Sequence, residues 1–206
     1  NPDPLAICLV REVLMGTSAH ADSLFALQGI GSYGITVAGT QKQCERWLPS
    51  IAAADDLAAL ALTELETGSD LKALKTTVTP EGNCLRLTGE KSFISNAGAA
   101  ALYLVLAREK EGHSLLLVPG NSPGISITPT PEIIAPHVLG EIRFDNVELA
   151  ANARLGEPGK GFSLVLATLG VFRASVAGAA VGLAQAALDE ALRHTNGRVQ
   201  FGRPLS

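Results

Sequence analysis

The first quarter of the chain shows the spacing of apolar residues that is typical of helices. Apolar side chains recur at three- and four-residue steps between residues 5 and 14, and Gln41–Ile51 carries its apolar residues on one face. Glycines punctuate these runs at Gly29–Gly31 and at Gly39-Thr40. The pattern therefore predicts helices over residues 4 to about 55, separated near these glycines.

The pattern changes at Leu57 to short apolar or alternating runs bounded by Gly, Pro and Asn, which are typical of strands. These runs are residues 57–62, 85–88, 102–107, 114–118 and 142–145. Pro80–Asn83 between two runs predicts a hairpin turn, and Pro119–Gly124 predicts a loop that closes another strand. We therefore expect a small antiparallel β domain.

After Gly156–Gly159 the helical period returns, and it predicts one helix from about Lys160 to the mid-190s. Small side chains repeat along this helix and would let another helix approach closely. The small residues are Gly170, Ala174, Gly178, Gly182 and Ala186. The partner is one of three: the N-terminal helices, another subunit, or sequence outside this chain.

The composition is that of a globular protein, because 47% hydrophobic and only 17% charged residues are ample for a buried core. A net charge of -4 without runs of Lys or Arg argues against nucleic acid and anionic lipid as partners. Cys8, Cys44 and Cys84 form no C-x-x-C pair, so we predict buried thiols in a reducing compartment. The four histidines lack ligand spacing, so we interpret them as surface or loop residues and predict no metal site.

No signal peptide is expected, because the N-terminus has neither a basic region nor a cleavage signature. Residues 162–188 are apolar and, at about 1.5 Å per residue, long enough to cross a bilayer. Arg173 would lie near mid-bilayer at a cost of about 2.5–3.5 kcal/mol. We therefore interpret this segment as a buried helix of a soluble protein and expect no membrane span.

Three short stretches carry the candidate chemistry. Thr63-Glu64 ends an apolar strand, and Thr67–Asp70 follows as a turn. The amides and hydroxyls of this turn suit a phosphate or the polar edge of a planar cofactor, and an ordinary Asx or serine turn is the alternative. Gly89–Asn96 is interpreted as a hairpin turn leading into a strand that ends in a polar pair. Arg198–Gly202 follows the long helix, where a guanidinium can grip a phosphate or simply interact with the helix dipole.

Together these stretches resemble the acyl-CoA dehydrogenase family, whose patterns read T-E-P-x-A-G-S-D, G-x-K-x-W-I-T-N and R-x-x-F-G. The order of helices, β domain and long helix is also that of the family, so the resemblance implies its α+β fold. It divides the chain into residues 1–56 (the end of an N-terminal helical domain), 57–158 (a central β domain for flavin and acyl-CoA) and 159–206 (the first long helix of a C-terminal helical domain). Because the chain stops four residues after Gly202, we expect the central portion of a longer enzyme.

The resemblance implies that the first stretch binds FAD. Thr63 and the backbone of Leu62 would contact the flavin ring. Gly68 and Ser69 would contact the pyrophosphate.

The other implied site residues come from the second stretch and the long helix. Phe93 replaces the common Trp that packs on the flavin ring, and Ser95 replaces the Thr that hydrogen-bonds the ring edge; an ordinary core aromatic is the alternative for Phe93. Arg198, followed by Phe201, would reach the FAD pyrophosphate of a neighbouring subunit. Arg173 matches an active-site arginine at the substrate, and a charge on an apolar face should be paired or functional.

The chain also departs from the family pattern. Leu65 stands where Pro is usual, and Glu132–His137 replaces a Gly-Arg-Ser-like loop beside the substrate. The catalytic Glu of most members lies in a C-terminal part that this chain does not contain, and in some branches it occupies the position of Phe172. The family gives no base role to the carboxylates near the flavin stretch, so no catalytic residue is identified in this span.

The implied function is that of an FAD-dependent acyl-CoA dehydrogenase of fatty acid metabolism. It would desaturate an acyl-CoA thioester at the α,β bond, pass electrons to an electron-transfer flavoprotein and work as a homotetramer. Two alternatives stay open: an oxygen-using flavin monooxygenase or oxidase on the same fold, and a non-catalytic scaffold or subunit of a split hetero-oligomer. The expected location is the cytoplasm in a bacterium or the mitochondrial matrix in a eukaryote.

Overall fold

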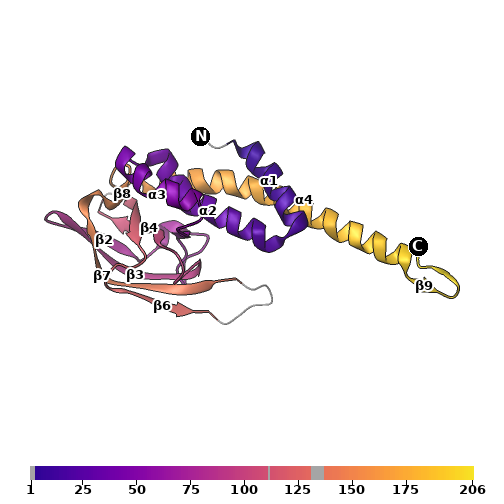
Figure 1. Cartoon of the computed structure of the whole chain (residues 1–206). Coiled ribbons are helices and arrows are strands. Elements are labelled where there is room, and N and C mark those ends of the chain that lie inside the picture. The colour runs from indigo at the N-terminus through magenta and orange to yellow at the C-terminus, as the bar shows by residue number, and fades with distance from the viewer. Residues whose placement is uncertain (1–2, 111, 131–136) are drawn as a thin grey trace. The chain divides into compact units, whose positions relative to one another are not determined.

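The computed structural model describes residues 3–110, 112–130 and 137–206. In these residues three helices precede a central β-sheet and one long helix follows it (Figure 1). The predicted α+β class and element order are therefore confirmed.

The described chain forms two compact units. The first joins the N-terminal segment up to Ala26 with Gly170–Ser206, and the second is Leu27–Leu169. The division of the chain at residues 56 and 158 into family domains stays a prediction.

In the first unit the small residues of the long helix meet the N-terminal helix. Helix α1 (Pro4–Thr17) lies against the later part of α4 (Gly161–Gly197). A Cβ atom built on Gly182 would lie 1.9 Å from the carbonyl oxygen of Glu12, and one on Gly178 would also collide with α1. Helix α1 therefore contacts the row of small residues at Gly178 and Gly182, where glycine permits the close approach, and the other two partners considered stay predictions.

A buried ion pair ties together the elements of the first unit. The Arg11 guanidinium on α1 donates to both carboxylate oxygens of Asp22, at 2.8 and 2.7 Å, near the start of α2 (Ala19–Ala38). It also donates to the Ser175 hydroxyl on α4 at 3.0 Å. This bidentate geometry satisfies both buried charges.

Helix α3 (Gln41–Ala52) begins at a capping box. The Thr40 hydroxyl accepts from the Gln43 amide at 3.3 Å, and the Gln43 side chain accepts from the Thr40 amide at 2.8 Å. Gln43 also donates to the carbonyls of Asn152 and Arg154, which anchors α3 to the β domain. The predicted break before this helix is confirmed.

The predicted break at Gly29–Gly31 is wrong, because these residues lie inside α2. Gly31 serves packing instead: a Cβ atom built on it would come within 2.7 Å of Ala58. A helix tolerates glycine at a cost of about 1 kcal/mol when the packing requires it.

The strands of the described residues form one eight-stranded sheet and one two-stranded hairpin. The strands of the large sheet are β1 (Ala58–Ala61), β2 (Thr77–Glu81), β3 (Cys84–Ser95), β4 (Leu102–Glu109), β5 (Gly112–Pro119), β6 (Ile125–Pro129), β7 (Leu139–Ala150) and β8 (Arg154–Leu155). The purely antiparallel expectation is wrong, since β1 and β2 each pair with β4 in parallel. The long connection between β1 and β4, which carries β2 and β3, makes the parallel pairing possible.

Two predicted turns are confirmed and one is wrong. The chain turns between β2 and β3, where Gly82 has a φ of +58°, and a loop joins β5 to β6. The segment from Gly89, expected to begin as a hairpin turn, lies within β3, and Gly89 pairs with Phe144 of β7. The pairing has irregularities on both sides of this point.

Strand β4 is buried on both faces because the sheet carries apolar layers on each side. Leu102, Leu104 and Leu106 pack with helical residues, while the alternating Tyr103 and Val105 pack with other strands. This explains its continuous apolar sequence. The cysteines are free, as predicted, but are half-buried rather than fully buried.

The predicted long helix is confirmed as α4, yet the expectation that it is buried is wrong for the described chain. Only 28% of its most apolar stretch is buried, and Val176, Val181 and Leu188 are exposed. By length and composition α4 could cross a membrane, a test that core helices of soluble proteins also pass. The absence of a membrane span stays a prediction.

Candidate functional site

The tight turn after β1 lies at Glu64–Thr67, a few residues before the turn predicted at Thr67–Asp70. The Glu64 amide donates to the Thr67 carbonyl at 3.0 Å, and the Thr67 amide donates back to the Glu64 carbonyl at 3.1 Å. Beyond the turn Gly68 and Ser69 are exposed, and a Cβ atom built on Gly68 would meet no atom within 4 Å. The segment after the turn therefore presents exposed backbone and the exposed side chain of Ser69 to a ligand.

The structure brings the first and second stretches side by side. The Ser92 amide of β3 donates to the Thr63 carbonyl at 2.9 Å, and the Lys91 ammonium donates to the Leu62 carbonyl at the same distance. Leu62 is buried and Thr63 is half-buried. The carbonyls of Leu62 and Thr63 are thus engaged by β3, and the predicted contacts of the Leu62 backbone and of Thr63 with the flavin ring stay predictions.

Phe93 lies on the outside of β3. Its φ of +58° is unusual for a residue other than glycine, and it falls in the irregular pairing between Lys91 and Ile94. The irregularity turns the ring outward, leaving 55% of the residue exposed. This exposure argues against an ordinary core aromatic and leaves a flat apolar surface available for stacking.

Ser95 at the end of β3 is half-buried and hydrogen-bonded to a histidine. The distance between the Ser95 Oγ and the Nε2 of His137 is 2.8 Å. His137 is the described residue of the Glu132–His137 loop, and its other positions, 132–136, lie outside the described residues. The interpretation of the histidines as ordinary surface or loop residues misses this contact.

A buried ion pair joins the two stretches. The Lys91 ammonium donates to the Glu64 carboxylate at 3.0 Å, and the Lys91 side chain is 0% exposed. The same carboxylate accepts from the backbone amides of Lys75 at 2.6 Å and Thr76 at 2.9 Å. Glu64 therefore holds three segments of the chain around the site.

These contacts keep both Glu64 and Lys91 charged at neutral pH. Burial raises the pKa of Glu64, but the amides of Lys75 and Thr76 and the Lys91 ammonium outweigh it and lower the pKa to about 2. Burial lowers the pKa of Lys91 to about 8, opposed by Glu64. A carboxylate of such low basicity, fully engaged by donors, is unsuited to remove a carbon-bound proton.

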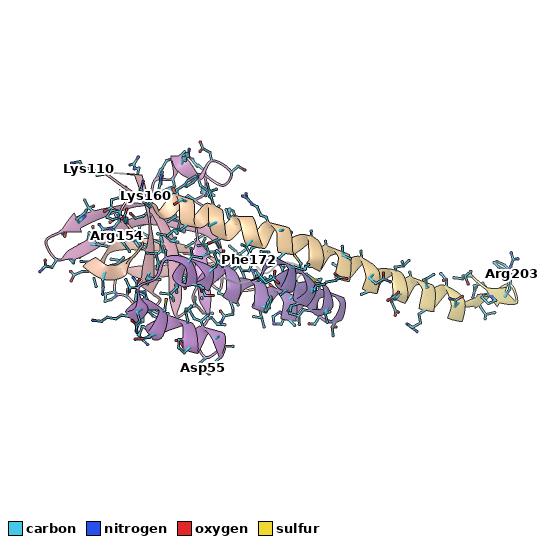
Figure 2. The ribbon with its side chains drawn as sticks, turned by 90° about the horizontal axis from the view of Figure 1, so that it is seen from above. Asp55, Lys110, Arg154, Lys160, Phe172 and Arg203 are labelled. Atoms are coloured by element: carbon cyan, nitrogen blue, oxygen red, sulfur yellow. The ribbon has the colours of Figure 1, made fainter. Side chains whose placement is uncertain are left out.

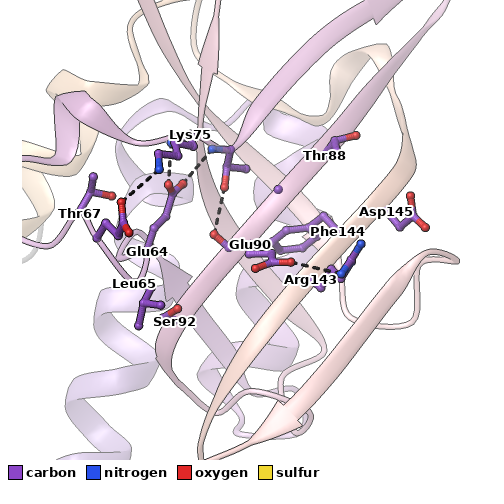
Figure 3. Close-up of a pocket in the computed structure, with 13 residues that line it drawn as sticks. Glu64, Leu65, Thr67, Lys75, Thr88, Glu90, Ser92, Arg143, Phe144 and Asp145 are labelled. Atoms are coloured by element: carbon purple, nitrogen blue, oxygen red, sulfur yellow. Dashed lines mark hydrogen bonds and ion pairs between the residues drawn. The ribbon is translucent and has the colours of Figure 1, made fainter.

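A pocket of about 400 Å³ lies beside this ion pair, between the Glu64–Thr67 turn, the Gly89–Ser92 part of β3 and Arg143–Asp145 of β7 (Figure 3). Glu90 and Arg143 face one another across its rim at 3.4 Å. The buried hydroxyl of Thr67, where the family pattern has Ala, has no hydrogen-bond partner among the described residues. An orphaned buried hydroxyl in a pocket wall fits a polar ligand.

Arg173 belongs to the first unit, where its side chain is exposed and forms no ion pair with the described residues. Solvent reaches the guanidinium, so its charge is not buried in the described chain. Its neighbour Phe172 is buried. The substrate role of Arg173 stays a prediction.

Arg198 and Phe201 also belong to the first unit, beyond the end of α4. There β9 (Val199–Gln200) and β10 (Arg203–Pro204) form a small hairpin (Figure 2). Phe201 and Gly202 both have positive φ, of 53° and 77°, as a two-residue hairpin turn requires. The Phe201 side chain is fully exposed and Arg198 is exposed as well.

Sequence reasoning missed the structural role of Glu64 and Lys91, although one signal was present. Lys91 alternates in step with the buried Leu85 and Leu87 of the same strand, so it lies at a position where a charge needs a partner. No comparable signal marks His137. Among the described residues no cluster of His, Cys, Asp or Glu could hold a metal ion.

Two family models match the chain. The acyl-CoA dehydrogenase middle domain matches residues 59–147, and the acyl-CoA dehydrogenase C-terminal domain matches residues 159–206. An "Acyl-CoA dehydrogenase" of Bacillus subtilis is 33% identical over 97% of this chain and 55% of its own length. A "Cyclohexane-1-carbonyl-CoA dehydrogenase" of Geobacter metallireducens is 32% identical over 97% of this chain and 54% of its own length.

Solved structures give the same picture. A glutaryl-CoA dehydrogenase from Mycobacterium smegmatis in complex with FADH2 matches with a TM-score of 0.94 and 29% identity, over 100% of this chain and 54% of its own. Butyryl-CoA dehydrogenase from Megasphaera elsdenii matches with a TM-score of 0.93 and 31% identity, over 98% and 55%. A chain described under "Electron transferring flavoprotein of Acidaminococcus fermentans" matches with a TM-score of 0.94 and 29% identity, over 99% and 56%. The chain therefore spans about half the length of the relatives it matches.

Proposed function

Because this chain belongs to the acyl-CoA dehydrogenase family, we propose that the complete protein is an FAD-dependent enzyme that desaturates an acyl-CoA thioester at its α,β bond. The observation that carries the proposal is the Ser92–Thr63 backbone hydrogen bond, which brings together the two stretches expected to hold the cofactor. The exposed Phe93 ring and the Ser95 hydroxyl lie on the same strand.

The residues present fit FAD. Phe93 offers a flat apolar surface, Thr63 and Ser95 offer hydroxyls to a ring edge, and Gly68 and Ser69 offer open backbone and a hydroxyl to a pyrophosphate. Bound FAD would supply the oxidising chemistry, and these residues would bind and orient it. The structure of a relative with FADH2 supports this assignment.

The reaction also needs a base, and we propose that it lies outside residues 1–206. Glu64 is held by three donors with a pKa of about 2, and position 172 carries a buried phenylalanine. We therefore expect the chain alone, reconstituted with FAD and mixed anaerobically with acyl-CoAs of graded length, to form no enoyl-CoA. Formation of enoyl-CoA would show that a base exists in this span.

We further propose that Arg198 and Phe201 serve the FAD of a neighbouring subunit in a homotetramer, and that Arg173 serves the substrate. The exposure of the hairpin after α4 supports the first proposal. The electron acceptor would be an electron-transfer flavoprotein, and the match to a chain described under that name supports it. The proposed location is the cytoplasm in a bacterium or the mitochondrial matrix in a eukaryote.

The flavin assignment is tested on the complete protein by its visible spectrum and by FAD released with acid. Phe93→Ala should weaken FAD binding, whereas Leu188→Ala, which changes an equally exposed apolar residue on α4, should not. A colourless protein that takes up no added FAD would overturn the proposal. Substrate-dependent oxygen consumption without reduction of an electron-transfer flavoprotein would replace the dehydrogenase by an oxygen-using enzyme.

A further inference from the structure

The hydrogen bond between His137 and Ser95 is fixed by strand register. Ser95 pairs with Leu139 at the start of β7, and the Asn96 amide donates to the Val138 carbonyl at 2.9 Å. These backbone contacts place residue 137 beside the end of β3. The 2.8 Å contact between the Ser95 Oγ and the imidazole Nε2 then follows from the fold.

The side-chain contact is not needed to join the two strands. Backbone pairing runs without interruption from Ile94 opposite Gly140 to Asn96 beside Val138. Neighbouring Asn96 has a structural bond of its own, since its side chain donates to the Ala58 carbonyl at 3.2 Å. The contact between His137 and Ser95 is therefore additional to the framework.

A serine hydroxyl has one proton to donate and two lone pairs to accept, and its rotation decides which of them faces a ligand. An imidazole nitrogen is a donor or an acceptor according to its tautomer. A histidine that engages the Ser95 oxygen therefore determines whether the hydroxyl proton points towards the imidazole or away from it. In the second case the proton is available to a ligand.

We propose that His137 is a positioning residue that orients the Ser95 hydroxyl towards the edge of the flavin ring. The inference rests on the proposed function, in which Ser95 faces that edge. The oxidised ring edge accepts hydrogen bonds there, whereas the reduced edge also carries an N–H donor. Because an imidazole nitrogen donates or accepts according to its tautomer, His137 lets the same hydroxyl pair with either form.

The test is a double-mutant cycle on the complete protein with its FAD. His137→Leu should weaken FAD binding by about 2- to 10-fold, the range for one neutral hydrogen bond, and should shift the flavin absorbance. In a Ser95→Ala background the same change should have little further effect, because the orienting role acts through the hydroxyl. His137→Gln, whose amide can donate and accept, should restore most of the affinity and the absorbance.

His113→Leu is the matched control, because His113 also contacts an oxygen through Nε2, the Lys72 carbonyl at 3.2 Å, and neither residue is among those predicted to bind FAD. It should leave FAD affinity and absorbance unchanged. Effects of His137→Leu that are equal with and without the Ser95 hydroxyl, or none at all in a protein that binds FAD, would overturn the inference alone. A wild-type protein that binds no FAD would overturn the proposed function as well.

Discussion

Replacing Glu64 by alanine should strongly destabilise the second unit. The change removes a carboxylate that accepts from two backbone amides, at 2.6 and 2.9 Å, and from Lys91 at 3.0 Å. It leaves a fully buried ammonium whose remaining bond is to the Leu62 carbonyl. Removing one member of a buried pair costs about 3–5 kcal/mol, because the other charge loses its partner.

The matched control lies two residues away. Glu66 forms an ion pair with Lys75 at 3.2 Å in which both side chains are more than 70% exposed. Such pairs contribute about 0–1 kcal/mol, so Glu66→Ala should be nearly neutral. The contrast isolates burial, since both changes remove a carboxylate from the same turn.

Urea unfolding followed by tryptophan fluorescence measures the difference. Trp47 is the only tryptophan of the chain and lies on α3 in the second unit, so it reports on the unit that holds the ion pair. Combining Glu64→Gln with Lys91→Met removes both charges and should recover at least half of the loss. If Glu64→Ala costs no more than Glu66→Ala, the pair does not hold the site together.

Three further predictions concern pH, helix packing and cofactor retention. Folding lowers the pKa of Glu64 from 4.5 to about 2, so its contribution to the free energy of unfolding is complete above about pH 4.5 and is lost as the pH falls towards 2. After discounting for solvent screening this contribution is about 2 kcal/mol. In urea titrations, acid should therefore destabilise Glu64→Gln less than the wild type by about that amount. Gly182→Ala should lower the melting temperature, because its Cβ atom would lie 1.9 Å from the Glu12 carbonyl oxygen. Gly170→Ala, with open space around it, should instead stabilise α4 by about 0.5–1 kcal/mol. Equal effects of the two substitutions would contradict the packing of α1 on α4. Arg198→Ala should weaken FAD retention of the complete protein by about 1.5–3 kcal/mol in equilibrium dialysis and leave its circular dichroism unchanged, and unaltered retention would remove Arg198 from the site.

The helices were predictable from the sequence because their signals are local. Thr40 and Gln43 form a capping box within four residues, and the small residues of α4 recur every four residues, which is about one helical turn. Gly31 was wrongly predicted to break the helix, because what requires a glycine there is a tertiary contact, the close approach to Ala58. The parallel pairing of β1 with β4 was missed for the same cause, since it depends on residues far along the chain.

The candidate site was predictable in its location and less so in its internal contacts. The motif around Thr63 and the motif around Phe93 identify the two segments, and a backbone hydrogen bond joins them. The exposure of the Phe93 ring depends on an irregularity in strand pairing that the sequence does not indicate. The contact of His137 with Ser95 depends on register between strands, which a pattern of alternation does not specify.

The bond between Arg11 and Ser175 also bears on the order in which the protein folds as it is synthesised. The two residues are 164 positions apart, so at about 5–20 residues per second roughly 8–30 s separate their emergence from the ribosome. During that interval the Arg11 guanidinium of α1 already has its carboxylate partner Asp22, but α1 lacks the glycines of α4 against which it packs. The second unit holds its own core between residues 27 and 169 and can form first. Until α4 emerges, α1 therefore lacks its close helix contact, and its apolar residues Leu5, Leu9 and Val13 remain exposed even after folding.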